Sequence, residues 1–91
     1  MHKFFGMFQI GQLNVTPKAK LIDPRVLHAA LCRHMAGDWG SVCQDDMLAN
    51  DEALRTGEER LFSIYESNGQ VFWIITNEER TVTMILLPDE N

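Results

Sequence analysis

The dipeptide Asn68-Gly69 separates two stretches that are rich in β-branched and aromatic residues, and it is the strongest short signal for a β-hairpin in this chain. Residues 60–66 and 70–76 are therefore predicted to be antiparallel strands joined by a two-residue turn. Such a turn fixes the register of the pair. The expected cross-strand partners are Tyr65 with Phe72, Ser63 with Ile74, and Leu61 with Thr76.

A third strand is predicted over residues 81–87, after a four-residue loop at 77–80, and Pro88 ends the sheet. With this loop length, Thr81 is expected opposite Thr76, and Thr83 opposite Ile74. The three strands then form an antiparallel meander.

Strand alternation gives this meander two different faces. The first, called the apolar face below, comprises Phe62, Ile64, Val71, Trp73, Ile75, Val82, Met84 and Leu86. Because an apolar sheet face needs cover, we expect the helices to pack on it. The second, called the mixed face, comprises Leu61, Ser63, Tyr65, Phe72, Ile74, Thr76, Thr81, Thr83, Ile85 and Leu87. We expect the N-terminal aromatic segment or a partner subunit to cover part of the mixed face, which gives a candidate surface for a homodimer.

A strand and two helices are predicted before the meander. The strand covers residues 8–15, and the first helix covers residues 24–35, with Asp23 as its N-cap and Pro24 in its first turn. The resulting order, β-α-α-β-β-β, predicts a single α+β domain in which two helices pack on one face of an antiparallel sheet.

The segment between the helices predicts a fixed corner. Gly37 is a helix stop, Asp38 is a helix start, and Trp39, followed by Gly40, is too large to leave unpacked. The second helix is expected over residues 38–54, closed by Gly57. Its buried stripe would contain Trp39, Cys43, Met47, Asn50 and Leu54.

The composition limits the classes of macromolecule that the chain is expected to bind and the compartment in which it is expected to lie. The net charge of −5 argues against general binding of nucleic-acid phosphates, which needs a basic surface. No apolar stretch approaches the roughly 18 residues that span a membrane, and the N-terminus does not read as a signal peptide. Two cysteines do not make a disulfide framework, so a cytoplasmic protein is expected.

Two polar residues, His34 and Asn50, lie within the apolar stripes of the predicted helices. If they meet near the corner, an Asn-oriented His could act as a general base. The structural alternative, in which both satisfy buried hydrogen bonds, is the more common arrangement.

A second group of polar residues follows Gly57 in the pattern G-x-x-R-x-x-S-x-Y. Ser63 and Tyr65 share the mixed face with Thr76 and Thr83, and such hydroxyls could bind a small polar ligand. The alternative is ordinary cross-strand pairing of hydroxyl side chains. No base for a serine nucleophile is evident nearby.

The second helix and the residues after it are strongly acidic. Against Arg55 alone, residues 38–59 hold the acids Asp38, Asp45, Asp46, Asp51, Glu52, Glu58 and Glu59. Such a face can occupy a basic groove of another protein, although it is more often a solvated surface.

A metal site is not expected. Of His28, Cys32, His34 and Cys43, only the first two have a spacing typical of a helical ligand pair. No cofactor is expected either. The full set of candidate site residues is His34, Asp46, Asn50, Arg60, Ser63, Tyr65, Thr76, Arg80 and Thr83.

From Gly11 onward the chain resembles a family of small bacterial proteins that are frequent on plasmids and other mobile elements. The residues that carry the resemblance include His34-x-x-Gly37-Asp38-Trp39-Gly40, Asn50-Asp51, Trp73-Ile74-Ile75-Thr76 and Leu86-Leu87-Pro88. Members are often labelled as a type I restriction methyltransferase subunit. A methyltransferase needs a doubly wound domain with a Gly-rich cofactor loop, which a chain of 91 residues with these motifs does not contain. The resemblance implies a shared fold and a mobile-element context.

These observations lead to one expected function and two alternatives. The expected function is a small accessory protein that binds another macromolecule, most simply a protein, and is not an enzyme. The order of elements also resembles that of RelE/ParE-like toxins, so a nucleic-acid-processing toxin that uses some of His34, Arg60, Tyr65 and Arg80 is an alternative. A sensor that binds a small ligand on the mixed face is the other.

Overall fold

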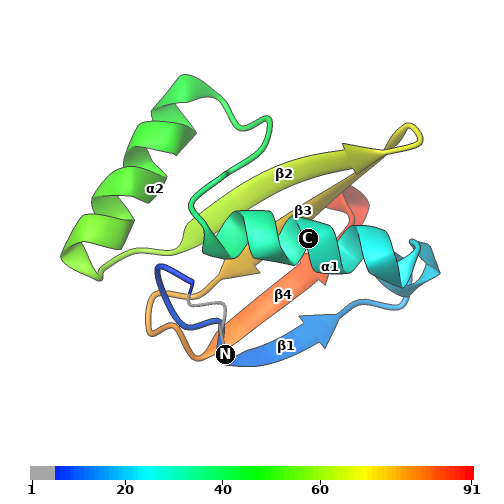
Figure 1. The fold of residues 1–91 in the computed structure, drawn as a ribbon, viewed down its shortest axis with the longest axis horizontal. Helices are drawn as coiled ribbons and strands as arrows, with labels where there is room; N and C mark the ends of the chain where they lie inside the picture. Colours follow the sequence, from blue (N-terminus) through cyan, green and yellow to red (C-terminus); the bar gives the residue numbers. More distant parts are fainter. Residues whose placement is uncertain (1–5) are drawn as a thin grey trace, which may run out of the picture.

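The computed structural model describes residues 6–91 and confirms the α+β fold and its order of elements. The strands are β1 (Gln12–Val15), β2 (Leu61–Ser67), β3 (Gln70–Thr76) and β4 (Val82–Leu86), and the helices are α1 (Pro24–Met35) and α2 (Gln44–Thr56). Two short 3-10 helices, η1 (Ala19–Leu21) and η2 (Pro88–Glu90), complete the fold. The four strands form one sheet in the order β1-β4-β3-β2 (Figure 1).

The first strand differs from its prediction in length and in pairing. It begins at Gln12, and it lies parallel to β4 at the edge of the sheet. The Gln12 N–H donates to the Thr81 carbonyl at 2.8 Å, and the Thr16 N–H donates to the Ile85 carbonyl at 3.0 Å. The sheet is therefore mixed, and not the purely antiparallel meander that was predicted.

The predicted β2–β3 register is confirmed at all three expected pairs. Asn68 and Gly69 have φ values of 52° and 80°, the left-handed conformation that a two-residue type I′ turn requires. The β3–β4 register was wrong by two residues, since Thr76 pairs with Thr83. The loop is longer than expected because the Asn77 side chain accepts the N–H groups of both Thr81 and Val82. A shift of two residues leaves the faces unchanged.

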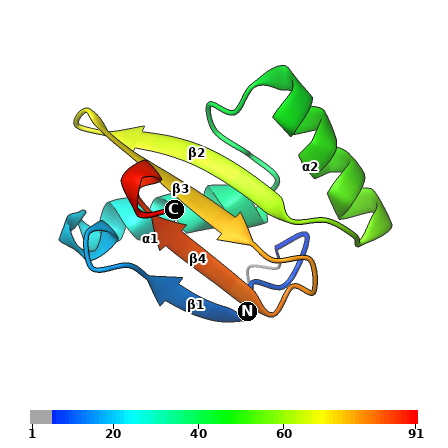
Figure 2. The ribbon, with the colours of Figure 1, turned by 180° about the vertical axis from the view of Figure 1, so that it is seen from behind.

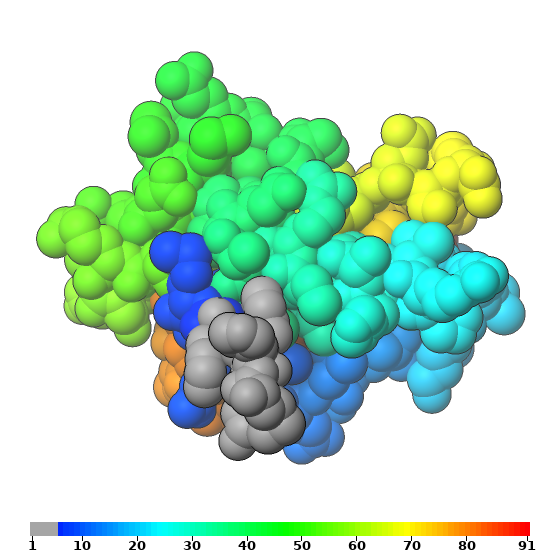
Figure 3. All heavy atoms as spheres, in the orientation of Figure 1, coloured from blue at the N-terminus to red at the C-terminus, as the bar shows by residue number. Residues whose placement is uncertain are grey.

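The two helices take different positions relative to the sheet. α1 crosses the front of the sheet, whereas α2 lies beside β2 at the opposite edge from β1 (Figure 1). The sphere view of the same side shows α1 and the residues that follow it packed over the strands (Figure 3). No helix within residues 6–91 is long and apolar enough to cross a membrane.

The predicted start of the second helix at Asp38 was wrong, because α2 begins at Gln44. α1 does end at Met35, and the next turn closes at Gly37 with a φ of 80°. The chain then runs extended, and Gly40 forms a parallel β-bridge with Ile64 of β2. Pairing with β2 thus replaces the first predicted turn of the helix, and it leaves Cys43 and Met47 exposed.

The assignment of the sheet faces was reversed. The mixed face carries α1, and the side chains with no more than 3% exposure on it are Leu61, Ser63, Tyr65, Phe72, Ile74, Thr76, Thr83 and Ile85. The apolar face is turned away from α1 (Figures 1 and 2), and at the β2 edge its Phe62 and Ile64 pack against the cluster that includes Ala53 of α2. The mixed face is therefore not available as a surface for a second subunit. The reversal occurs because His34 of α1 forms hydrogen bonds with hydroxyls of the mixed face.

Candidate functional site

His34 anchors a chain of hydrogen bonds beneath α1. Its Nδ1 lies 2.5 Å from the Ser63 hydroxyl, and its Nε2 lies 3.0 Å from the Thr76 hydroxyl. Thr76 and Thr83 are 2.7 Å apart, and the Thr83 hydroxyl donates to the Ile10 carbonyl at 2.8 Å. The side chains of all four residues, His34, Ser63, Thr76 and Thr83, are fully buried. His34 of α1 thus bonds to hydroxyls of β2 and β3, and Thr76 links it to the hydroxyl of β4.

The carbonyl at the end of this series of hydrogen bonds determines which group donates and which accepts in each bond. A carbonyl only accepts, so Thr83 donates to Ile10 and must accept from Thr76. Thr76 has then used its single proton, so His34 Nε2 donates to it. Nδ1 accepts from Ser63 when the imidazole is neutral. The geometry therefore selects the neutral imidazole with its proton on Nε2.

The surroundings of His34 also disfavour its charged form. Burial, and secondly the positive charge of Arg80, lower the pKa of His34 from 6.5 to about 4. Phe8 and Trp39 contact the imidazole edge-on, with ring centroids 5.3 and 5.6 Å away. A fully buried imidazole with both nitrogens bonded has no position for a substrate, which assigns His34 a structural role.

Tyr65 joins the mixed face to the corner after α1. Its hydroxyl donates to the Asp38 carbonyl at 2.6 Å, and burial raises the pKa of Tyr65 to about 12. The Asp38 carboxylate pairs with Arg33 at 2.8 Å, and this bond lowers the pKa of Asp38. Asp38 therefore holds the corner and is not the N-cap of α2.

Asn50 and His34 do not bond to each other, contrary to the hypothesis of an oriented pair. The Asn50 side-chain nitrogen donates to the Phe62 carbonyl at 2.7 Å, and its oxygen accepts the Phe62 N–H at 3.0 Å. Farther along the same edge of β2, Ile64 N–H donates to the Trp39 carbonyl, and the Ser41 N–H donates to the Ile64 carbonyl. Asn50 and the corner thus occupy the outer edge of β2 and protect it from pairing with another strand.

Arg80 ties the β3–β4 loop to the end of α2. Its guanidinium donates to the carbonyls of Glu59 at 2.7 Å, Asn77 at 2.9 Å and Ala53 at 3.1 Å. Burial lowers the pKa of Arg80. A guanidinium that is bonded to backbone carbonyls of three segments has a structural role, as in a helix C-terminal cap.

The residues considered for a toxin-like active site are thus not assembled into one. His34 lies inside the core, Tyr65 reaches the corner, and Arg60 lies on the opposite face of the sheet, over the Phe62 ring. Among residues 6–91, no group of three or more His, Cys, Asp or Glu side chains could hold a metal ion. His28 and Cys32 do lie 3.7 Å apart on α1, but the other two residues of the predicted set lie elsewhere.

The acidic residues of α2 are exposed, in line with the more common interpretation of such a surface. Asp45 and Asp46 lie in the first turn, where their negative charges interact favourably with the helix dipole. Asp51 accepts the Trp39 indole N–H at 3.0 Å and so helps to hold the corner. Asp46 also borders a hollow of about 280 Å³ that reaches Arg60.

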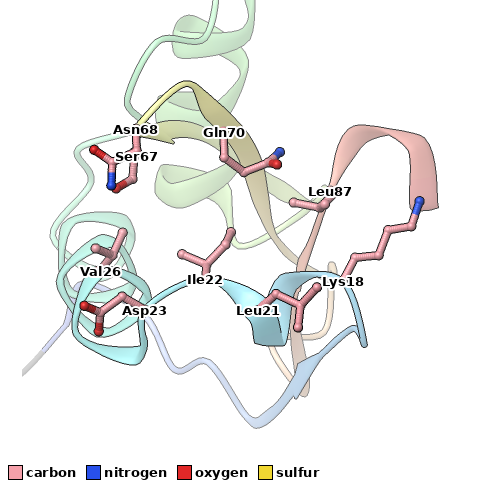
Figure 4. Close-up of a pocket in the computed structure, with 9 residues that line it drawn as sticks. All are labelled: Lys18, Leu21, Ile22, Asp23, Val26, Ser67, Asn68, Gln70 and Leu87. Atoms are coloured by element: carbon pink, nitrogen blue, oxygen red, sulfur yellow. The ribbon is translucent and has the colours of Figure 1, made fainter.

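A larger hollow of about 500 Å³ lies between η1, the start of α1 and the β2–β3 turn (Figure 4). Its charged side chains are already paired. Lys18 points to η2, where it bonds to Asp89 at 2.5 Å, and Asp23 bonds to Arg25 at the N-terminus of α1. The hollow therefore offers no unpaired charged group, and its remaining polar lining is Ser67, Asn68 and Gln70 at the β2–β3 turn.

The apolar face is the most distinctive surface of the described structure. Met84 is 37% exposed, and Phe62, Trp73 and Ile75 are partly exposed beside it on neighbouring strands. Phe62 and Trp73 contact edge to face, with ring centroids 5.2 Å apart. η2 curls over one end of this face, where Leu86 is only 3% exposed (Figure 2).

Sequence analysis identified these residues but expected helices to cover them. One signal in the sequence could have shown that the mixed face is the buried one. It is the set of hydroxyls on adjacent strands of that face, together with a histidine on the apolar stripe of the first helix. Polar side chains that can form hydrogen bonds with one another cost less free energy to bury than unpaired ones do.

The chain matches no family model, and neither a curated protein nor a solved structure matches it significantly. Its function is therefore inferred from the contacts described above.

Proposed function

We propose that this chain is a small accessory protein of a mobile element that acts by binding protein through its apolar face. The mobile-element context is supported by the resemblance of residues 11–88 to small plasmid-borne proteins. The mode of action is supported by one observation, the partly exposed apolar sheet face, which α1 does not cover and η2 covers at one end only.

The composition of this face is that of a protein interface. Aromatic residues and methionine are enriched in the centres of such interfaces. Here Trp73 and Met84 lie on the two central strands, and Phe62 lies beside Trp73 on β2. An apolar patch of a few hundred Å² is about the largest that a monomeric protein leaves in water, and such a patch often has a function. Its side chains lie on the rigid strands of a sheet, so binding would cost little backbone ordering.

The charge of the chain favours a protein partner over nucleic acid. The net charge is −5, and the cations Lys18, Arg33 and Arg55 pair with carboxylates. Few positive charges are left to neutralise phosphates, which supply most of the affinity in non-specific nucleic-acid binding.

The alternatives receive less support from the geometry. The hydroxyls proposed for a ligand sensor bond to His34 or to each other in the core. Among residues 6–91 every buried side-chain nitrogen and oxygen has a hydrogen-bond partner within the protein. The core of this part of the chain therefore has no unpaired polar group that could bind a ligand.

A matched pair of variants tests the proposal by affinity capture from a nuclease-treated bacterial lysate that also contains the untagged chain. Met84→Glu places a charge on the apolar face, whereas Met47→Glu places the same charge on α2, where methionine is 41% exposed. We expect the wild type and Met47→Glu to retain a defined protein that Met84→Glu loses. Equal capture by both variants, or capture that disappears with nuclease, would contradict the proposal.

A further inference from the structure

We infer that the occupant of the apolar face is a second copy of this chain, packed face to face about a two-fold axis. This inference rests on the proposed function, because it takes the apolar face to be a protein interface. It adds the identity of the partner and the way in which the two faces meet.

The first argument is the placement of two opposite charges on β2. The Arg60 guanidinium lies over the Phe62 ring at 5.5 Å, so it borders the apolar face at the start of the strand. Glu66 projects from the same face near the end of the strand, where it is exposed. Six residues of extended chain separate the two, or about 20 Å. Within residues 6–91 neither side chain forms an ion pair.

The second argument is the pattern of apolar residues between these charges. Two rows of side chains cross the face, one formed by Phe62, Ile75 and Met84, and the next by Ile64, Trp73 and Leu86. A two-fold axis between the rows, in the interface plane and perpendicular to the strands, exchanges them. Each row then faces the other row of the second copy, and Trp73 meets a β-branched Ile75. Leu86 lies beneath η2 and does not take part in the contact.

The same axis pairs the charges. Arg60 lies one step before the first row, and Glu66 lies one step after the second. The axis therefore brings Arg60 of each copy to Glu66 of the other, which gives two symmetric ion pairs at the rim. An axis parallel to the strands would instead place β2 over β1, at the opposite edge of the sheet, and leave both charges unpaired. Charge complementarity thus selects one of the two ways of packing the faces.

The size of the face predicts how tightly the copies associate. Four strands at about 4.8 Å spacing, with four to seven residues each, give a footprint of roughly 350 Å² per copy. A stable interface of standard size buries about 800 Å² per partner. The dimer should therefore be weak and depend on protein concentration over the micromolar range.

Reversal of the two charges tests the pairing by analytical ultracentrifugation of the purified chain. In Arg60→Glu alone, or Glu66→Arg alone, both rim pairs become repulsive, and we expect dimerisation to weaken roughly ten-fold. Mixing these two variants restores both attractive pairs, so a heterodimer should form with about wild-type affinity. Lys20→Glu, a charge reversal on exposed η1, is the matched control and should dimerise as the wild type does.

Three results would overturn the inference: a wild type that stays monomeric at several hundred micromolar, single variants that dimerise normally, or a mixture that does not recover. Circular dichroism of each variant excludes unfolding as the cause of a lost dimer. These results leave the proposed function standing if Met84→Glu still loses a captured protein in the lysate experiment. Equal capture by Met84→Glu and Met47→Glu would instead refute the proposed function, whatever the oligomeric state.

Discussion

The side-chain amide of Asn50 bonds to both the N–H and the carbonyl of Phe62, so it takes the place of a neighbouring strand at the outer edge of β2. This relationship explains why a polar residue is buried on α2. It also determines where the chain can associate. With the β2 edge of the sheet protected by Asn50 and the corner, a partner is left with the apolar face and the β1 edge.

Asn50→Ala should lower the stability of the fold by about 2 kcal/mol, because it leaves two backbone groups of Phe62 without partners. For a chain of this length that loss corresponds to a decrease of roughly 10 °C in Tm. Gln44→Ala removes an exposed amide from the same helix and should change Tm little. Equal effects of the two substitutions in a thermal melt would refute the structural role of Asn50.

His34 should make stability depend on pH between about 4 and 6.5. Its pKa is lowered to about 4 in the folded chain, whereas in the unfolded chain it lies near 6.5. In this interval the unfolded chain binds the extra proton, so stability is greatest above pH 6.5 and falls as the pH is lowered toward 4. The shift corresponds to a loss of up to about 3 kcal/mol.

Urea unfolding at a series of pH values measures this dependence. His34→Gln removes the titrating group and should flatten the dependence between pH 4 and 6.5. His28→Gln, at an exposed position on the same helix, should leave the wild-type slope unchanged. An unchanged slope in His34→Gln would show that another group is responsible.

Gly40 permits the close approach of the corner to β2. A Cβ atom there would lie 1.9 Å from the Ile64 carbonyl oxygen, and the φ of Gly40 is 73°. Gly57 has a nearly equal φ of 76°, but a Cβ atom there would meet nothing within 4 Å. We expect Gly57→Ala to cost about 1 kcal/mol, from the backbone conformation alone. Gly40→Ala should cost about 3 kcal/mol or more, because the backbone must also move. Similar costs for the two substitutions in urea unfolding would contradict the close approach at Gly40.

Much of the fold could be predicted from the sequence, because local signals determine it. Asn68-Gly69 fixed the register of β2 and β3, and Asp23-Pro24 and Gly37 marked both ends of α1. The start of α2 could not be predicted in this way. It depends on the pairing of Gly40 with Ile64, which is distant in sequence and overrides the local capping signal of Asp38.

The choice of sheet face also depended on distant contacts. Apolar content favoured the wrong face, because Ser63, Thr76 and Thr83 are costly to bury when unpaired. In the structure the two nitrogens of His34 and the Ile10 carbonyl satisfy these hydroxyls, so the mixed face could be buried. His34, Ser63, Thr76 and Thr83 were all among the candidate site residues, but their common role in the core became clear only from their distances.

Methyl NMR spectra of the purified chain, recorded over a dilution series, test the central claim most directly. We expect the signals of Ile64, Ile75 and Met84 on the apolar face to shift with protein concentration. Met47 on α2 and the buried Ile74 of the mixed face should stay in place. Shifts confined to Met47 and its neighbours, or no shifts up to several hundred micromolar, would contradict the claim that the apolar face is where a second copy binds.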